Sequence, residues 1–550
     1  MRIQLPNDNL PVSEMVKYDS IKYVTSNKQI IDNSAKNISW WSQVISNTYD
    51  VEHNIGIITI PKGVSIGNNA FSECDNLTSI TIPDSITEIG SSAFAKCSNL
   101  TSVHITDIAK WCNMIFSNYN SNPLTYAHNL YINGKLITDL EIPDNIASIS
   151  NYAFSGCGSL ISITMPDNIT SIGRCAFKNC TSLESITIPD SVTEIGDGAF
   201  SGCCNQYCFD GKYSSADKRC LIVNKRLVAF APYGLSEYII PDDIIEIGDT
   251  VFYNCSRLTS ITIPDCVTSI GNYTFSKCSS LKNINIPNNV TSIGSHVFSE
   301  CNSIKNINIP DNVISIWDSA FDGCSSLKHI TIPDSIISIG NWTFAGCSSL
   351  TSITIPDNVT SIGNSIFYGC RNLKSVNIGN GITSIGDYAF FGCYDLTDIT
   401  IPDSVTSIGD SAFWGCCNLT NITLPDSITK IGNYVFQICD KLRSIVIPEK
   451  VTKIGDCVFV YCNNLTSITI PAGVTEIGKE TFIDCRKLAN VYCKPTTPPD
   501  LGYHAFINIS SSIKIYVPRA SVDAYKSAEY WRFYASKIEG YDFYKKVETE

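Results

Sequence analysis

A single pattern of apolar and polar positions recurs along most of the chain. One copy runs from Leu350, position 1, to Cys370, position 21, with apolar residues at positions 1, 4, 6, 10, 13, 17 and 18. Residues 353–355 read Ile-Thr-Ile, and this period of two is typical of a half-buried strand. Pro356 follows, and because proline has no N–H to donate, it should end the strand. The pattern therefore predicts one short strand at the start of every copy.

The copies follow one another at a fixed interval. Position 18 is phenylalanine, and from Phe252 onward successive copies are 23 residues apart, each with cysteine three residues later. The sixteen phenylalanines stand at residues 71, 94, 154, 177, 200, 252, 275, 298, 321, 344, 367, 390, 413, 436, 459 and 482. A fixed period of this size indicates a solenoid, whose strands would stack in parallel at about 4.8 Å per coil. We therefore predict a β-rich, right-handed solenoid of 23-residue coils.

Two intervals are longer than the rest, at 60 residues after Phe94 and 52 residues after Phe200. Each contains one lengthened coil, at about residues 100–136 and 206–234, after which the register resumes. An extra segment that leaves the register intact bulges from the stack and opens no new domain. We therefore predict three parts, which are an N-terminal segment at 1–53, one solenoid at 54–507 and a C-terminal cap at 508–550.

Both lengthened coils contain a hairpin pattern. In the first, Asn133 and Gly134 separate two short apolar runs, and this dipeptide favours a two-residue hairpin turn. In the second, residues 220–230 have a similar pattern around Asn224 and Lys225. Each lengthened coil is therefore expected to carry a hairpin.

The two ends must cap the stack, because an open solenoid exposes a strand edge and apolar core. At the C-terminus, residues 513–517 predict a strand and residues 522–538 a helix, with Ser521 as its N-cap. The residues expected to cover the last coil are Val522, Tyr525, Ala528 and Trp531.

Glycine recurs at position 14, for example at Gly363 and Gly386. Glycine at a fixed position indicates either a turn with positive φ or a close approach of two backbones. Ser150 and Trp317 stand at this position in two coils, so a positive φ is not obligatory there.

Composition and charge exclude some classes of partner. Of the 550 residues 44% are hydrophobic and only 17% charged, so the chain can bury a large core, and its net charge is −13. A negative protein is poorly suited to phosphate backbones, so we predict no nucleic-acid partner. No stretch approaches eighteen apolar residues, which argues against a transmembrane segment. The first thirty residues contain no apolar run behind a basic start, and no secretory signal is expected there.

The residues that usually carry chemistry follow the repeat or are scattered. Of 25 cysteines, sixteen occupy position 21, where they are expected to pack as small buried thiols. Cys204 and Cys208 offer only an x3 spacing without a nearby histidine, so no metal site is predicted. The histidines form no HExxH motif or other catalytic constellation, and the recurring aspartates suit turns. We therefore predict no enzyme and no cofactor.

Function in a repeat protein should lie where neighbouring coils depart from their consensus. Position 19 is small or polar in several coils but large over six consecutive ones. It holds Tyr368, Phe391, Trp414, Gln437, Val460 and Ile483. Such a row would extend about 25 Å at one strand spacing per coil, and contiguous exposed apolar surface often marks an interface. We predict a binding row anchored by Trp414; the alternative is that the row packs under the C-terminal segment or broadens the core.

Two further groups of aromatic residues are candidates for binding. Position 16 gives a broken row that could stack on sugar rings or contact protein, formed by Tyr273, Trp342, Tyr388 and Tyr434. The first lengthened coil adds Trp111 and Tyr126, because insertions into a solenoid commonly decorate one face and carry specificity.

The repeats, which read Leu-x-x-Ile-x-Ile-Pro-Asp-x-Val-x-x-Ile-Gly-x-x-Ala-Phe-x-x-Cys, resemble the BspA-like leucine-rich repeats, also called the Treponema pallidum type. The segments at residues 21–31 with 44–49 and at 515–525 look like companion modules of gut Bacteroidetes members. The resemblance implies a leucine-rich-repeat solenoid and an extracellular or cell-surface location, with a cytoplasmic one left open. Members are typically secreted or surface proteins linked to adhesion, and the family offers no catalytic motif to carry over.

These observations favour a bacterial, adhesin-like binding scaffold that recognises a protein ligand. Two alternatives stay open, which are a carbohydrate-binding solenoid and a purely structural spacer. The spacer hypothesis predicts that no partner binds saturably.

Overall fold

The computed structural model describes residues 18–31 and 38–543 of the chain. Parts of the predicted terminal segments lie outside the described residues, namely 1–17, 32–37 and 544–550. The first of these covers much of the stretch in which no secretory signal is expected. The domain boundaries at residues 53 and 507 stay predictions.

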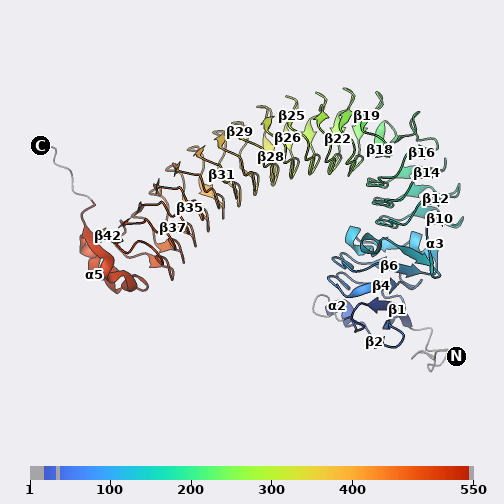
Figure 1. Ribbon diagram of the computed structural model, residues 1–550, viewed down its shortest axis with the longest axis horizontal. Helices are drawn as coiled ribbons and strands as arrows, with labels where there is room; N and C mark the ends of the chain where they lie inside the picture. Colours follow the sequence, from blue (N-terminus) through green and yellow to red (C-terminus); the bar gives the residue numbers. More distant parts are fainter. Residues whose placement is uncertain (1–17, 32–37, 544–550) are drawn as a thin grey trace. The chain divides into compact units, whose positions relative to one another are not determined.

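The chain divides into two compact units. Unit 1 consists of Met1–Leu235 with Asp243–Cys255, and unit 2 of Ser236–Asp242 with Ser256–Glu550. In each unit the short strands of successive coils lie side by side (Figure 1). The fold is therefore the predicted β-solenoid of 23-residue coils with parallel strands.

Each coil begins with the strand that the sequence predicts. β29 (Ser352–Ile355) pairs in parallel with β30 (Ser375–Ile378), with Ser352 opposite Ser375. Ile353 is buried and Thr354 exposed, in the predicted alternation. In unit 1 these strands are β4 (Leu77–Thr81), β6 (Ser102–Ile105), β8 (Leu130–Ile132), β10 (Asp139–Glu141), β12 (Ser162–Thr164), β14 (Ser185–Thr187) and β16 (Cys208–Asp210). The others in unit 2 are β19 (Glu237–Ile239), β21 (Ser260–Thr262), β23 (Asn283–Ile284), β25 (Asn306–Asn308), β27 (His329–Thr331), β32 (Asp398–Thr400), β34 (Asn421–Ile422), β36 (Ser444–Ile445), β38 (Ser467–Ile470) and β40 (Asn490–Cys493).

A second short strand, at positions 12 and 13, was not predicted. β31 (Ser384–Ile385) pairs in parallel with β33 (Ser407–Ile408), and Ile385 is buried in the core. In unit 1 the related strands are β5 (Glu88–Ile89), β7 (Ile115–Phe116), β11 (Ser148–Ile149), β13 (Ser171–Ile172), β15 (Glu194–Ile195) and β20 (Glu246–Ile247). In unit 2 they are also β22 (Ser269–Ile270), β24 (Ser292–Ile293), β26 (Ser315–Ile316), β28 (Ser338–Ile339), β35 (Lys430–Ile431), β37 (Lys453–Ile454), β39 (Glu476–Ile477) and β41 (Asp500–Leu501).

Glycine at position 14 serves a close backbone approach and not a positive φ. A Cβ on Gly386 would lie 2.8 Å from the backbone N of Asn364 and 2.8 Å from the carbonyl carbon of Gly363 in the preceding coil. Beside this approach, the side chain of Asn364 accepts a hydrogen bond from the N–H of Asp387 at 2.8 Å. The same bond to a position-15 Asn or Asp of the preceding coil is made by the N–H groups of Ser295, Asn341, Asn364, Asp410, Asn433, Asp456 and Lys479.

Phenylalanine at position 18 and cysteine at position 21 form two parallel rows in the core. The rings of Phe367 and Phe390 stack with centroids 5.4 Å apart. The Sγ of Cys393 donates to the backbone carbonyl oxygen of Phe367 at 3.3 Å. All sixteen position-21 cysteines are buried and none forms a disulfide, which confirms the prediction of small buried thiols.

The lengthened coils both contain the predicted hairpins. In the first, β8 pairs antiparallel with β9 (Lys135–Leu136), and the turn residues Asn133 and Gly134 have positive φ angles of 50° and 80°. In the second, β17 (Cys220–Val223) pairs antiparallel with β18 (Arg226–Phe230). The first coil also holds the helices α3 (Ile108–Cys112) and α4 (Leu124–Ala127) and the 3₁₀ turn η1 (Tyr119–Ser121).

The N-terminal segment covers the first coil of unit 1. β1 (Tyr18–Thr25) inserts antiparallel between β3 (Ile55–Pro61) and β4, and β2 (Ser46–Asp50) pairs with the other edge of β3. Helix α2 (Ile38–Trp41) places the ring of Trp40 edge-on against Phe71, with centroids 5.5 Å apart. This segment therefore hides both the strand edge and the apolar end of the core.

The C-terminal cap is a strand plus a short helix, and the helix predicted at 522–538 is wrong in its extent. β42 (Lys514–Pro518) and the 3₁₀ turn η2 (Arg519–Ser521) precede α5 (Val522–Ser527), and the 3₁₀ helix η3 (Trp531–Lys537) and β43 (Ile538–Tyr541) follow it. The helix breaks at Ala528, which is extended, and at Tyr530, which has a φ of 58°.

The break in the helix brings Trp531 onto the last coil. Its Nε1 donates to the carbonyl oxygen of Pro499 at 2.8 Å, and Trp531 and Tyr525 are both fully buried. Ser521 occupies the predicted N-cap position, but its side chain makes no capping bond and its hydroxyl donates to the carbonyl oxygen of Thr496 at 2.7 Å. The cap is thus attached through hydrogen bonds to carbonyl groups of the preceding coil, and the helix is interrupted where these bonds form.

Candidate binding surface

Positions 15 to 20 of each coil form a turn, and the largest departures from the repeat lie on it. At position 20, Gly369 and Gly392 have φ angles of 71° and 69°, a conformation that glycine adopts without a steric penalty. Their N–H groups donate to the carbonyl oxygens of Phe391 and Trp414 in the next coil, at 2.7 and 2.8 Å. These bonds hold the position-19 residues of adjacent coils one above another.

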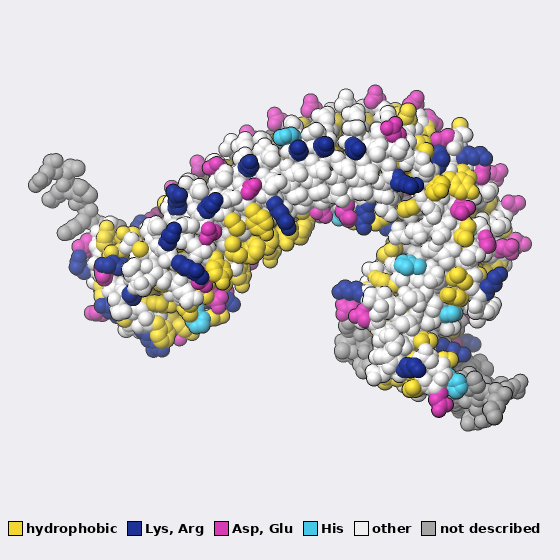
Figure 2. All heavy atoms as spheres, viewed as in Figure 1, with side chains coloured by type: hydrophobic (Ala, Val, Ile, Leu, Met, Phe, Trp, Pro, Cys, Tyr) yellow, Lys and Arg dark blue, Asp and Glu magenta, His cyan; other side chains and the backbone are white. Residues whose placement is uncertain are grey.

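Tyr368, Phe391 and Trp414 stack face to face, and we call these three residues the aromatic ridge. The ring centroids of Tyr368 and Phe391 are 4.7 Å apart, and those of Phe391 and Trp414 are 4.3 Å apart. The ring planes differ by 3° and 4°. Tyr368 is exposed and the other two are half-buried, and hydrophobic side chains gather on this part of unit 2 near β31 (Figure 2). The ridge therefore presents a continuous apolar edge to solvent.

Trp342 and Tyr388, two of the predicted position-16 residues, flank the aromatic ridge. The ring of Trp342 lies 5.3 Å from that of Tyr368, and the ring of Tyr388 lies 5.8 Å from that of Phe391, both tilted. Both flanking residues are exposed. The structure thus joins two rows that the sequence treats as separate.

The other two position-16 candidates have no ring contact with the aromatic ridge. Tyr273 stacks on His296 with centroids 4.3 Å apart, and burial lowers the pKa of His296. Tyr434 is exposed in the coil after that of Trp414. Neither residue extends the aromatic ridge.

The predicted position-19 row is interrupted after Trp414, by the polar Gln437 and the buried Val460. Gln437 and Ile483 are half-buried, and Val460 is only 5% exposed, which corrects its prediction as a binding residue. Val460 has a shorter side chain than the ridge aromatics, and the exposed aromatic of its coil is Tyr461 at position 20. The aromatic ridge therefore ends at Trp414.

Trp111 in the first lengthened coil is a core residue, which corrects its prediction as a binding residue. Its Nε1 donates to the carbonyl oxygen of Ala153 at 2.8 Å, and its ring packs edge-on against Phe116. Trp111 is one of the buried residues of helix α3, so its indole packs in the core. Tyr126 is half-buried, and its hydroxyl donates to Asn120 at 3.1 Å.

A shallow hollow of about 580 Å³ lies on the strand face of unit 2, over β27, β29, β30 and β32. The residues at positions 3 and 5 of these coils point outward and line the hollow. The polar side chains that line it are His329, Thr331, Ser352, Thr354, Ser375, Asn377, Asp398 and Thr400. This face offers hydrogen-bonding groups, but its apolar residues are turned into the core.

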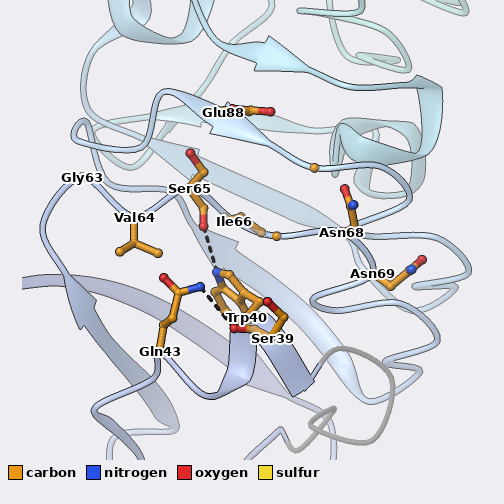
Figure 3. A pocket seen from close by; sticks show the side chains of 12 residues that line it. Ser39, Trp40, Gln43, Gly63, Val64, Ser65, Ile66, Asn68, Asn69 and Glu88 are labelled. Atoms are coloured by element: carbon orange, nitrogen blue, oxygen red, sulfur yellow. Dashed lines mark hydrogen bonds between the residues drawn. The ribbon is translucent and has the colours of Figure 1, made fainter.

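A second hollow, of about 660 Å³, lies beside helix α2 in unit 1 (Figure 3). The indole Nε1 of Trp40 donates to the carbonyl oxygen of Ser65 at 2.8 Å, and the amide of Gln43 donates to the carbonyl oxygen of Ser39 at 3.2 Å. Asn68 accepts from the N–H of Ser91 at 2.6 Å. The bond from Trp40 joins the N-terminal segment to the first coil, and the bond between Asn68 and Ser91 joins the first coil to the second, so these polar groups have structural roles.

Among residues 18–31 and 38–543, no group of three or more His, Cys, Asp or Glu side chains could hold a metal ion. Burial raises the pKa of Cys324 and Cys485 to about 12, so these thiols are protonated at neutral pH and are poor nucleophiles. No helix in the described part of the chain is long and apolar enough to cross a membrane.

Three exposed apolar residues escaped the sequence analysis as a group, namely Ile314, Trp317 and Ile337. They stand at positions 11 and 14, where the repeat usually has threonine and glycine. The sequence does contain a signal, because Trp317 stands where the repeat has glycine. The exposure of its neighbours could not be read from the periodicity.

Comparisons with known proteins place the chain among leucine-rich repeat proteins. The model of the BspA type leucine-rich repeat region matches in six copies, over residues 43–135, 127–216, 226–328, 314–443 and 406–539. A search among curated proteins finds no match.

Several solved structures are similar to parts of the chain. A leucine-rich repeat protein from Bacteroides ovatus ATCC 8483 is 27% identical, covering 74% of this chain and 92% of that chain with a TM-score of 0.46. A leucine rich cell surface protein from Faecalibacterium prausnitzii A2-165 is 30% identical, covering 54% of this chain and 83% of that chain with a TM-score of 0.42. The T. pallidum leucine rich repeat protein is 23% identical, covering 42% of this chain and 86% of that chain with a TM-score of 0.25.

Proposed function

The chain belongs to the BspA-type leucine-rich repeat family, and from this premise we propose that it is a non-enzymatic scaffold that binds a protein ligand through the aromatic ridge. The observation that carries the proposal is the face-to-face stack of Tyr368, Phe391 and Trp414 on the surface of unit 2. Repeat proteins of this fold typically bind and do not catalyse, which agrees with a function in recognition.

The ridge has the properties of a preorganised interface. Stacking fixes the three side chains, and the backbone bonds from Gly369 and Gly392 fix the coils that carry them. Little side-chain entropy is then lost on binding, which raises affinity. Aromatic residues are also enriched among the side chains that dominate interface energies. Trp414, at the end of the stack, would be the anchor.

The stacking geometry favours a protein over a carbohydrate at the ridge. A sugar ring packs on the open face of an aromatic ring, but both faces of Phe391 are covered by Tyr368 and Trp414. Phe391 therefore shows its ring edge, and such edges carry partial positive charge. Such edges suit aliphatic side chains and backbone carbonyl oxygens of a protein.

The family supports a location as well as a mode of action. BspA-like proteins are typically secreted or surface proteins linked to adhesion, which supports an extracellular or cell-surface, adhesin-like role for this chain. The chain has a net charge of −13 and an apolar ridge. A partner that carries positive charge beside apolar side chains would complement both features.

The proposal is tested by offering the purified chain to immobilised host matrix proteins, epithelial cells and a glycan array. We expect saturable binding to a protein, weakened about tenfold or more by Trp414→Ala, as for a hot-spot aromatic, with an unchanged melting temperature. Binding to glycans alone would contradict the proposed ligand class. No saturable binding to any of these would leave the structural spacer.

Carbohydrate is the second candidate, and the hollow on the strand face favours it. Its row of Ser, Thr, Asn and Asp side chains could accept and donate hydrogen bonds to sugar hydroxyls. A glycan that binds there should be released by Asn377→Ala but not by Trp414→Ala. The two variants therefore separate the two ligand classes.

A further inference from the structure

A second exposed apolar surface lies on the side of unit 2 that positions 11 to 14 form. Ile314, Trp317 and Ile337 are 50%, 56% and 56% exposed, and we call these three residues the 314–337 patch. We propose that this patch is a docking site for a protein segment in which apolar and basic side chains alternate. The site is separate from the aromatic ridge and does not depend on the function proposed for it.

The patch is a local departure from a regular repeat. Position 11 of the other 23-residue coils in unit 2 is threonine, at residues 268, 291, 360, 383, 406, 429, 452 and 475. Position 14 is glycine, at residues 271, 294, 340, 363, 386, 409, 432, 455 and 478. The coil thus folds with threonine and glycine at these positions, and it has no need of two isoleucines and a tryptophan.

The replacements also give up a stabilising contact. At position 11, the hydroxyl of Thr383 donates to the carbonyl oxygen of Thr360 in the preceding coil at 3.1 Å, and Thr406 and Thr475 make the same bond to Thr383 and Thr452. Isoleucine cannot donate such a bond. The patch therefore exchanges a hydrogen bond within the stack for exposed apolar surface, which favours a role in binding.

Strand pairing places Ile314 and Ile337 at the same position of adjacent coils, and Trp317 stands three residues after Ile314. β26 and β28 pair in parallel with Ser315 opposite Ser338, and the N–H of Ile337 donates to the carbonyl oxygen of Ile314 at 3.0 Å. The indole Nε1 of Trp317 donates to the hydroxyl of Ser315 at 3.3 Å. This bond fixes the indole beside β26.

The coil before Trp317 also departs from its neighbours. At position 15 of most coils in this unit an Asn or Asp side chain accepts a hydrogen bond from the next coil, as Asp318 does from the N–H of Asn341. The coil before Trp317 has Ser295 at that position, and its side chain makes no such bond to the N–H of Asp318. The departures from the repeat therefore involve two adjacent coils.

The charge around the patch selects the partner. Residues 306–327 and 329–370 contain no Lys or Arg, whereas Asp311, Asp318 and Asp334 are all exposed. The carboxylate of Asp318 accepts a hydrogen bond from the N–H of Asn341 at 2.7 Å, which holds it beside the patch. A second copy of the chain would bring carboxylates against carboxylates, which is unfavourable, whereas Lys or Arg beside apolar side chains would complement both features.

The test uses two fluorescein-labelled peptides of equal length, one of alternating Leu and Arg and one of alternating Leu and Glu. The variant Ile314→Thr, Trp317→Gly, Ile337→Thr restores the residues of neighbouring coils, so it should fold like the wild type and it keeps every charge. We expect saturable binding of the Leu-Arg peptide to the wild type and an affinity at least about tenfold lower for the variant, as for loss of a tryptophan anchor.

The controls separate this site from the others. The pair Phe391→Ser, Trp414→Ser should leave binding of the Leu-Arg peptide unchanged, whatever ligand the aromatic ridge binds. Equal binding of the Leu-Glu peptide, or equal binding of the Leu-Arg peptide to the triple variant, would overturn the proposal. So would a wild-type dimer in sedimentation equilibrium that the triple variant dissolves, because the patch would then be a contact between copies.

Discussion

At the scale of single residues, the stack depends on contacts that one coil makes with the next through fixed positions. Asn364 accepts from the N–H of Asp387, Gly386 leaves room for that approach, and Cys393 donates to the carbonyl oxygen of Phe367. Each contact recurs every 23 residues, so its contribution recurs as well.

Gly386→Ala should destabilise the coil, because the new Cβ would lie 2.8 Å from backbone atoms of Asn364 and Gly363 that cannot move aside. We expect the free energy of unfolding to fall by about 1 to 3 kcal/mol, as for other overpacked sites. Urea unfolding checks this against Ser361→Ala, which changes an exposed residue. Equal midpoints for the two variants would contradict the close approach.

The buried thiols predict a loss of stability at alkaline pH. Burial raises the pKa of Cys324 and Cys485 from 9.0 to about 12, so the folded chain keeps protons that the unfolded chain releases. The stabilisation is therefore complete below pH 9 and is lost as the pH rises toward 12, at up to about 1.4 kcal/mol per pH unit for each thiol.

The measurement is the urea midpoint at pH 8 and at pH 10. The midpoint should be lower at pH 10, and Cys324→Ser with Cys485→Ser should reduce the difference because serine does not ionise. A difference that the two substitutions leave unchanged would assign the alkaline loss to other groups.

At the scale of elements, the first strand of each coil and the two hairpins follow directly from local sequence. The period of two at residues 353–355 and the proline after it specify β29, and Asn133 with Gly134 specifies the turn between β8 and β9. The strands at positions 12 and 13 were missed because two residues are too few to show a period. They form only because a neighbouring coil supplies the partner.

The C-terminal helix shows a different limit of local reasoning. Residues 522–538 have helical apolar spacing, yet the helix ends at Ser527. The chain then turns so that Trp531 can donate to the carbonyl oxygen of Pro499, a partner more than thirty residues away. Tertiary contacts of this kind override helix propensity.

Trp531→Ala should therefore loosen the end of the solenoid. The indole is fully buried and lies 5.0 Å from the ring of Tyr525, and truncation of a buried tryptophan costs about 3 to 5 kcal/mol. Hydrogen exchange should speed up in β40 and β42, while Phe533→Ala, at a residue 69% exposed, should leave both strands protected. Unchanged exchange in the Trp531 variant would mean that the cap does not hold the last coils.

At the scale of the whole molecule, periodicity reveals the architecture but not which departures reach the surface. Trp414 and Trp111 are both large aromatic residues that depart from the regular repeat. Trp414 stacks at the surface, whereas Trp111 is buried and donates to the carbonyl oxygen of Ala153. Val460 continues the sequence row but is covered. The contact between Trp342 and the ridge depends on how adjacent coils are placed, and this placement cannot be read from residue spacing alone.

The central claim is that the aromatic ridge is the ligand-binding surface, and it is tested most directly by the affinity of the Phe391→Ser, Trp414→Ser pair for the protein that the wild type binds. We expect that affinity to fall by at least about two orders of magnitude, since two adjacent hot-spot residues are lost, with an unchanged melting temperature. The conservative Phe391→Tyr, Trp414→Phe pair, which keeps the stack, should restore most of it. Full affinity in the serine pair would contradict the account and move the binding site elsewhere on the solenoid.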